Sequence, residues 1–228
     1  MMTKKSLCML GGTALTIALA AVAAPASAQD AGDIQVKVLG TAVLPDGEID
    51  QVNFDLVGLP AGTQTEANNN FVPTLAIEYF VSPNISVETI CCATQHDVDG
   101  VDGAAGTELV ADGLLIPATF TLKYHFNPGG VSPYVGAGPT YFLWIDDEPG
   151  ATAVALGADD FSFSDELGFA LQAGIDIPIG DNGFGASIDA KRYFVGTTAT
   201  WFADGTPVIE TEHNLDPWVI SAGLSYRF

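Results

Sequence analysis

Hydrophobic and polar side chains alternate along the end of the chain, from Leu215 to Phe228. One set of alternate positions is apolar, namely Trp218, Ile220, Ala222, Leu224, Tyr226 and Phe228, and the other is mostly small or polar. A period of two predicts a β-strand with one apolar face. A free apolar edge invites aggregation in a soluble domain, whereas a membrane barrel closes its last strand on its first. The stretch therefore predicts the closing strand of a membrane barrel.

Seven further segments show the same amphipathic pattern. Each is about 10 residues long, the length that a tilted strand needs to cross a membrane. Together they predict an all-β, eight-stranded antiparallel transmembrane β-barrel. The predicted strands are Ile34–Leu44, Thr74–Phe80, Ile85–Cys92, Ala118–Phe126, Tyr134–Trp144, Gly168–Ile177, Phe184–Phe194 and Leu215–Phe228.

The connectors between these strands alternate in length. Short ones around Pro83, Pro128 and Asp181 are rich in Pro, Gly and Asn, which predicts tight turns. The others are long and carry most of the acidic residues: Pro45–Pro73, Ala93–Leu115, Ile145–Phe163 and Gly196–Asn214. Outer-membrane barrels are built in this way. We therefore expect long extracellular loops and both termini on the periplasmic side.

A targeting segment precedes the barrel. Lys4 and Lys5 come before an apolar run over residues 7–22, and Ala26-Ser27-Ala28 forms a small-x-small cleavage site. This pattern predicts a secretory signal peptide over residues 1–28 and a barrel domain over residues 29–228. A membrane anchor is the alternative, but the run is short for a spanning helix.

Charge and cysteine content narrow the classes of partner. The chain has 28 acidic and 7 basic residues, with a formal net charge of −21. Such acidity argues against nucleic acid and anionic lipid as ligands, although divalent ions could bridge the loops to the phosphates of surrounding lipopolysaccharide. The adjacent Cys91 and Cys92 admit two interpretations, a strained disulfide or redox switch and a pair of small apolar fillers, of which we favour the second.

Charged residues within the predicted strands fall mainly on the polar faces. A charge facing lipid at mid-membrane costs a few kcal/mol, so their parity predicts that they face the lumen. They are Lys37, Glu78, Glu88, Lys123, Asp176, Asp189, Lys191 and Arg227. They could form a conducting polar path or a salt-bridged plug. An eight-stranded barrel is just wide enough for side chains to fill, and unpaired charges are costly there, so the plug is favoured.

Several of these segments resemble one family. Leu-Asp-Pro-Trp-Val at Leu215–Val219, followed by Tyr226-Arg227-Phe228, resembles the C-terminal strand of the OmpW family of small outer-membrane proteins. Ser132–Gly138 resembles that family's fifth strand, and Tyr79–Val87 its second hairpin. The resemblance covers nearly all of the mature chain and is weakest in the long loops. It implies a monomeric eight-stranded barrel in the outer membrane of a Gram-negative bacterium.

The resemblance also implies a narrow lumen pinched by apolar side chains. The family's pinching positions fall on Ile90 and Lys191, with Tyr193 close by. Lys191 departs from the aromatic residue that the family places there, which implies a wetter and charged constriction. We expect Asp189, Glu88 or another carboxylate to neutralise Lys191.

Two further implications concern assembly and function. The barrel-assembly machinery is expected to read the terminal aromatic residues Tyr226 and Phe228 as an assembly signal. The family is associated with passage of small hydrophobic molecules, which predicts a narrow channel for passive transport of such solutes. The alternative is a non-conducting structural, adhesive or receptor barrel that acts through its acidic loops. Liposome swelling or uptake of an apolar solute would separate the two.

Catalytic and metal chemistry find little support. The histidines His96, His125 and His213 are scattered, so we expect no enzyme and no cofactor, and a triad of Ser187, Asp189 and His125 is only a weak alternative. The carboxylates Asp97, Asp99 and Asp102 would suit calcium. Their run lacks the distal Glu of a helix–loop–helix calcium site, and we interpret it as a solvated acidic loop.

Overall fold

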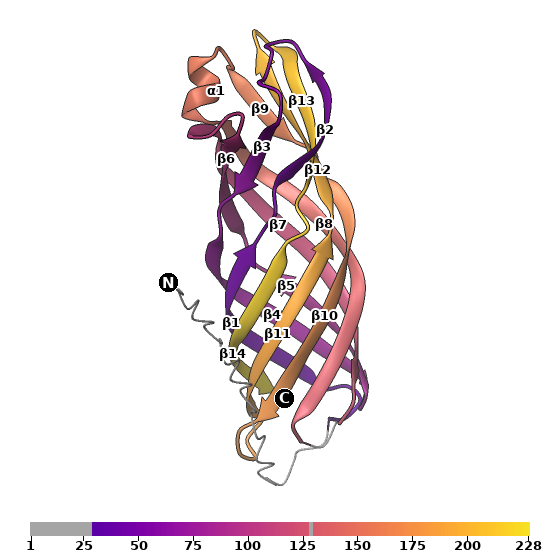
Figure 1. The fold of residues 1–228 in the computed structure, drawn as a ribbon. Coiled ribbons are helices and arrows are strands. Elements are labelled where there is room, and N and C mark those ends of the chain that lie inside the picture. Colours follow the sequence, from indigo (N-terminus) through magenta and orange to yellow (C-terminus); the bar gives the residue numbers. More distant parts are fainter. Residues whose placement is uncertain (1–28, 128–129) are drawn as a thin grey trace, which may run out of the picture.

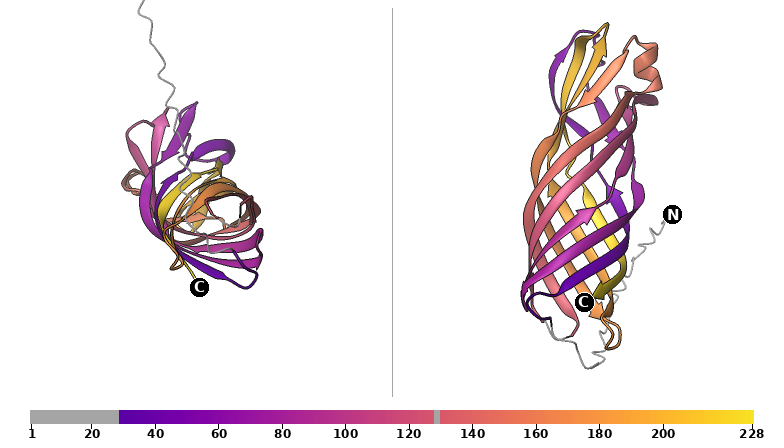
Figure 2. Two further views of the ribbon diagram at one scale, coloured as in Figure 1. Left: turned by 90° about the horizontal axis from the view of Figure 1, so that it is seen from below. Right: turned by 180° about the vertical axis from the view of Figure 1, so that it is seen from behind.

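The computed structural model describes residues 29–127 and 130–228. Long antiparallel strands wind around a closed barrel (Figures 1 and 2). The predicted signal peptide over residues 1–28 lies outside the described residues, as does the centre of the predicted turn at residues 128–129. In the described part of the chain, no helix is long and apolar enough to cross a membrane.

The barrel sheet closes through a ring of antiparallel pairings. The ring runs β7–β5–β4–β1–β14–β11–β10–β8, and β8 then pairs with β7. Its strands are β1 (Ile34–Leu44), β4 (Asn70–Ser82), β5 (Ile85–Cys91), β7 (Thr107–His125), β8 (Ser132–Pro149), β10 (Glu166–Pro178), β11 (Phe184–Phe194) and β14 (Trp218–Arg227). The bounds of β1 and β11 agree with the predicted strands, whereas β7 and β8 extend well beyond them.

The sheet that contains this ring has ten strands within residues 29–127 and 130–228, which corrects the predicted eight. The two additional strands are β3 (Thr63–Ala67) and β6 (Thr94–Asp102). Both lie in segments that the sequence predicted as loops. They form because β7 continues past the ring and offers its free edge to β6, which in turn pairs with β3.

A second sheet stands at one end of the barrel. It has the strand order β2 (Glu48–Asp55), β13 (Thr206–Asn214), β12 (Gly196–Ala203) and β9 (Asp160–Phe163), with the short helix α1 (Ala151–Ala155) nearby (Figure 1). The four predicted long loops are therefore largely structured. We call this end of the molecule the loop end, and the opposite end, which holds the tight turns and the C-terminus, the turn end.

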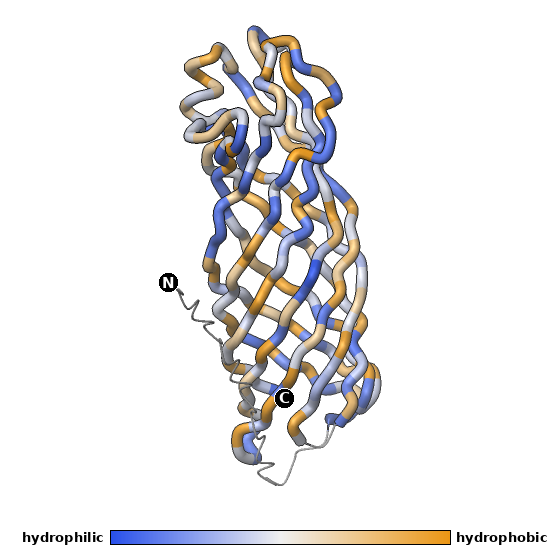
Figure 3. Tube along the Cα trace, viewed as in Figure 1, coloured by the Kyte–Doolittle hydropathy of each residue, from blue (hydrophilic) through white to orange (hydrophobic). Residues whose placement is uncertain are grey.

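Alternation along the strands separates two environments. Figure 3 shows apolar and polar residues following one another along the barrel strands. Outward side chains such as Phe120, Leu122 and Tyr124 are apolar and exposed, while their neighbours Thr121 and Lys123 are buried in the lumen. In the loop-end half of the lumen the buried side chains become apolar and form one cluster: Val43, Val72, Leu115, Phe142, Ala170, Tyr193, Val195, Leu215 and Val219.

Candidate functional site

A layer of paired charges crosses the lumen. Lys37 Nζ lies 2.8 Å from Glu78 Oε2 and 3.0 Å from Glu88 Oε2. Lys123 Nζ contacts the same two oxygens at 2.8 and 2.9 Å. These four side chains come from four neighbouring strands and are 0% exposed. We call them, together with Asp176, Asp189 and Lys191, the charge layer.

The other three members of the charge layer, Lys191, Asp189 and Asp176, lie at the edges of this group of four. Lys191 Nζ lies 3.2 Å from Glu88 Oε1 and 3.4 Å from Asp189 Oδ2, the two partners that the sequence analysis names. Asp176 lies 3.3 Å from Lys37. Arg227 stands apart at the turn end, where its Nε donates a 3.0 Å hydrogen bond to Gln35 Oε1. The structure thus brings seven of the eight predicted inward charges into one network.

Neutral side chains complete the layer. Gln172 Nε2 donates to Glu88 at 2.9 Å and to Asp189 at 3.0 Å. The Tyr134 hydroxyl donates to Asp189 at 3.2 Å, and its ring centre lies 3.7 Å from Lys123 Nζ. Gly174 makes room for this ring, because a Cβ there would lie 2.5 Å from the Tyr134 ring. Buried charges are tolerable only when they are paired and hydrogen-bonded, and the charged atoms of this layer satisfy that condition with the exception of Asp176 Oδ2.

An apolar pocket lies between the charge layer and the loop end. Ile90 and Tyr193 belong to its lining, together with Leu115, Phe142, Trp144, Phe163, Trp201 and Val219. The cavity between these side chains has a volume of about 50 Å³. Trp144 and Phe163 stack with ring centres 4.0 Å apart. The predicted constriction residues are therefore divided, because Ile90 and Tyr193 line the apolar pocket while Lys191 pairs within the charge layer.

Two buried histidines line the same pocket near the loop end. His96 Nε2 lies 2.9 Å from Thr94 Oγ1, and His213 Nε2 lies 2.6 Å from Thr211 Oγ1. Burial disfavours the charged imidazolium and lowers the pKa of both rings below the usual range. Neutral rings with hydrogen-bonded nitrogens leave the pocket without a charge of its own.

A second apolar pocket lies closer to the tip of the loop end. Its lining includes Ile49, Leu59, Leu109, Leu156 and Val208. Trp201 lines both pockets, and its Nε1 donates a 3.2 Å hydrogen bond to the Leu109 carbonyl oxygen. The two apolar spaces therefore adjoin at the Trp201 side chain.

The remaining predicted site residues are scattered. Asp97, Asp99 and Asp102 lie on β6, where residues on one face are about 7 Å apart, and they do not form a cluster of metal-ligating atoms. Tyr226 and Phe228 are exposed at the turn end, with ring centres 6.0 Å apart.

The contacts of the two cysteines and of Ser187 decide two further predictions. Cys91 is exposed and its thiol is free, as is that of the half-buried Cys92. Ser187 donates to Asp176 at 2.5 Å, and His125 contacts Glu78, Ser86 and Ser132, so Ser187, Asp189 and His125 do not form a hydrogen-bonded triad.

Sequence reasoning missed the aromatic side chains at the rim of the pocket. Phe163 and Trp201 lie in segments predicted as loops, and Trp144 lies at the end of a predicted strand. One signal could have found Trp201: Asp204-Gly205 stands between two Thr-rich runs, which is a hairpin pattern. The structure has that hairpin as β12 and β13, with positive φ angles of 50° and 69° at the two turn residues.

Comparisons with known proteins agree on one family. A family model described as the OmpW family matches residues 30–228. An uncharacterized outer-membrane protein, y4mB, of Sinorhizobium fredii is 34% identical over 197 residues, which cover 85% of this chain and 79% of the relative. Outer membrane protein W of Vibrio cholerae is 28% identical and covers 99% of this chain and 100% of its own length. The crystal structure of OprG from Pseudomonas aeruginosa superimposes with a TM-score of 0.76 at 22% identity, covering 88% of this chain and 98% of its own.

Proposed function

The chain belongs to the OmpW family of outer-membrane proteins, and we propose that it is a narrow channel for passive transport of small hydrophobic molecules. It is an all-β antiparallel barrel of the outer membrane of Gram-negative bacteria. In this proposal the eight strands of the closed ring cross the membrane, while β3, β6 and the second sheet project outside the cell. The apolar pocket above the charge layer is the observation that carries the proposal.

Solutes would reach this pocket from the loop end. The two apolar pockets adjoin at Trp201, so a small apolar molecule could pass between them by displacement of one side chain. Transfer of apolar surface out of water is worth about 25 cal/mol per Å², and the lining is almost entirely apolar. Trp144 Nε1 is a buried donor of the lining without a hydrogen-bond partner, and a hydroxyl group of a solute could accept from it. An apolar molecule would therefore be retained there, whereas an ion would not.

Passage straight down the axis would meet the charge layer. An apolar solute that crossed it would have to separate Lys37 and Lys123 from Glu78 and Glu88, and it could not replace the lost interactions. We therefore propose that solutes leave the pocket above this layer.

The wall offers a place for such an exit. The pairing of β4 with β5 ends at Leu75 and Cys91, and within the described residues β6 pairs with β3 and β7 but not with β4. Cys92 and Thr94, which lie where β5 gives way to β6, line the apolar pocket. No backbone ladder joins β4 to β6 in the described residues, although Asn70 Nδ2 donates a 2.7 Å hydrogen bond to the Gln95 carbonyl oxygen across this seam. Separation of the two strands there would open the pocket sideways into the membrane.

Uptake of a radiolabelled medium-chain alcohol by cells that express the protein would test the proposal. Leu115→Gln places a polar amide in the pocket, where an unpaired amide costs about 1–3 kcal/mol, so we expect uptake to fall roughly tenfold. Leu56→Gln makes the same change at an exposed loop-end position and should leave uptake unchanged. Uptake by wild-type cells no higher than by cells without the protein would favour the non-conducting alternative, and equal uptake above that level by Leu115→Gln and wild type, with both folded by heat-modifiability on gels, would exclude the pocket as the route.

A further inference from the structure

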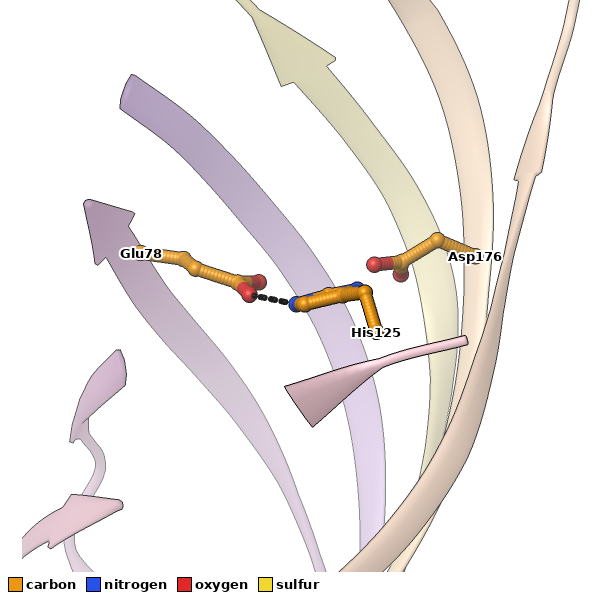
Figure 4. Close-up of side chains that lie close together, drawn as sticks. All are labelled: Glu78, His125 and Asp176. Carbon is orange, nitrogen blue, oxygen red and sulfur yellow. Dashed lines mark hydrogen bonds and ion pairs between the residues drawn. The ribbon is translucent and has the colours of Figure 1, made fainter. Parts of the chain in front are cut away.

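We propose that Glu78, His125 and Asp176 bind a divalent transition-metal ion at the turn-end side of the charge layer. The three residues belong to β4, β7 and β10, and Figure 4 shows their side chains converging on one point of the lumen. One ligand atom of each lies within 4.8 Å of the others, and all three side chains are buried. Within residues 29–127 and 130–228, this is the one group of three or more potential metal-ligating side chains.

The imidazole of His125 is held in a suitable orientation. Its Nε2 lies 2.9 Å from Glu78 Oε1, and its Nδ1 lies 3.3 Å from the Ser132 hydroxyl. A ligating histidine commonly donates its other ring N–H to a neighbouring oxygen, which fixes the tautomer. With Nδ1–H donating to Ser132, the lone pair of Nε2 faces the proposed ion.

Asp176 supplies an acceptor that the protein leaves unused. Its side chain is nearly inaccessible, with the residue 4% exposed, and Oδ1 accepts a 2.5 Å hydrogen bond from Ser187. Oδ2 is buried and has no hydrogen-bond partner. Buried carboxylate oxygens are rarely left so, because the loss of hydration is costly. A bound cation would satisfy this oxygen.

The net charge of the charge layer also favours a bound cation. The charge layer holds four carboxylates, from Glu78, Glu88, Asp176 and Asp189, against the three ammonium groups of Lys37, Lys123 and Lys191. With His125 neutral, these seven groups carry a net charge of −1, and the nearest further cation is Arg227 at the turn end, which interacts electrostatically with Asp176 and Glu78. The two lysines nearest the site engage Glu78 through Oε2, so Oε1, which accepts a 2.5 Å hydrogen bond from the Ser86 hydroxyl, is the oxygen that faces His125.

The donor set indicates the class of ion. One imidazole and two carboxylates suit zinc and its neighbours in the first transition series better than calcium, which takes oxygen ligands alone. Zinc ligands lie about 2.0–2.2 Å from the ion, hence roughly 3.4 Å apart in a tetrahedral site. The 2.9 Å pair of Glu78 and His125 is close to that spacing, and Asp176 would approach by about 1 Å. The Ser86 hydroxyl, 2.9 Å from His125 Nε2, or a water would supply the fourth ligand.

An ion can reach the site without crossing the charge layer. A cavity of about 300 Å³ opens at the turn end and is lined by Asp33, Gln35, Asp176 and Arg227 among others. Asp176 thus stands between this vestibule and the proposed site. Binding would be reached from the side opposite to the apolar pocket, so the site is independent of solute transport.

Zinc chloride titrated into the refolded, detergent-solubilised protein, followed by calorimetry, would test the site. We expect one zinc ion per chain in the wild type. Asp176→Asn removes one ligand charge and should weaken zinc binding at least tenfold. Asp189→Asn is the matched control, because it makes the same change within the charge layer but outside the site, and it should keep wild-type affinity. Heat-modifiability on gels reports whether each variant is folded.

A second ligand variant and a spectroscopic probe keep the test decisive even if Asp176→Asn fails to fold. His125→Gln should also weaken zinc binding at least tenfold. Cobalt(II) bound to the wild type should show visible d–d absorption bands, because coordination by the protein lowers the symmetry of the ion. The near-ultraviolet charge-transfer band that ligation by the Cys92 thiolate would give should be absent. No zinc binding to the wild type, or binding that Asp176→Asn and Asp189→Asn affect equally, would overturn the proposal, as would binding that only the acidic loops explain.

Discussion

Removal of the Lys123 charge would be the most informative perturbation of the barrel interior. Lys123→Met keeps the length of the side chain and deletes one ammonium group. Glu78 and Glu88 lie directly opposite each other on β4 and β5, and Lys123 Nζ contacts both at 2.8 and 2.9 Å. In the variant these two carboxylates would face each other with Lys37 as their main counterion, and like charges at opposite cross-strand positions are destabilising.

The size of the effect follows from the burial of the layer. Lys123, Glu78 and Glu88 have 0% exposed side chains, so water cannot take over the lost interactions. Breaking a buried ion pair by removing one partner costs about 3–5 kcal/mol. Lys191 contacts Glu88 and Asp189 at the longer distances of 3.2 and 3.4 Å, and Lys191→Met should therefore cost less than Lys123→Met.

Urea unfolding of the protein in lipid vesicles, followed by tryptophan fluorescence, would measure these free energies. The double variant Lys123→Met, Glu78→Gln lowers the numbers of lysines and carboxylates in the layer together and so restores the original imbalance of one negative charge. We expect it to recover a large part of the stability lost in Lys123→Met. A loss below about 1 kcal/mol in the single variant, or a double variant less stable than the single one, would refute the view that the layer is tightly paired.

Three further outcomes are expected. Deletion of Phe228, whose backbone exchanges two 3.0 Å hydrogen bonds with Ile34, should lower the yield of heat-modifiable barrel in cells, and a normal yield would remove its role as an assembly signal. The buried ring of His213 resists the proton that the unfolded chain takes up below about pH 6.5, so the protection factors of the β12 and β13 amides, which are corrected for the base-catalysed intrinsic exchange rate, should fall from pH 8 to pH 5, and His213→Gln should abolish the difference. An Asp-specific protease added to intact cells should cut at the exposed turn residue Asp204 before the turn-end residue Asp181, and the reverse order would invert the topology.

The strands of the ring could be predicted because their alternation spans a full crossing of the membrane. Lys37, Glu78 and Lys123 all stand at positions of the polar parity, and parity alone sends them inward. The ion-pair partners of these side chains could not be predicted from parity. Which charges meet across a lumen depends on the tilt and stagger of strands that are far apart in the sequence, and no local pattern encodes these quantities. Parity accordingly predicts that the charges face the lumen, but it does not predict that Asp176 lies beside His125.

The strands of the loop end escaped prediction for a different reason. β2 reads Glu-Ile-Asp-Gln-Val-Asn-Phe-Asp, which is polar on most positions and resembles a solvated loop. Its partner β13 lies more than 150 residues away, so the pairing that stabilises it is entirely non-local. Short polar strands of this kind acquire their structure from tertiary packing, because their own propensity is weak. The pocket rim was missed with them, since Trp201 and Phe163 are carried by β12 and β9.

The division of the lumen into a charged half and an apolar half has a physical consequence for selectivity. A lumen filled with apolar side chains throughout would let an apolar solute sink to any depth, and each deeper position would bury more of its surface. The charge layer ends that gradient at Ile90 and Tyr193, because Lys191, Glu88 and the Gln172 side chain hydrogen-bonded to Glu88 lie beyond them. Ions meet the opposite barrier, since the pocket above the layer offers them no partner. The two halves together would therefore retain small apolar molecules near the outer part of the membrane and close the axis to everything else. On this reasoning, replacing Ile90 by Glu should extend the charged half upward and reduce solute uptake without opening the axis to ions, which single-channel recording of the variant would reveal as unchanged conductance.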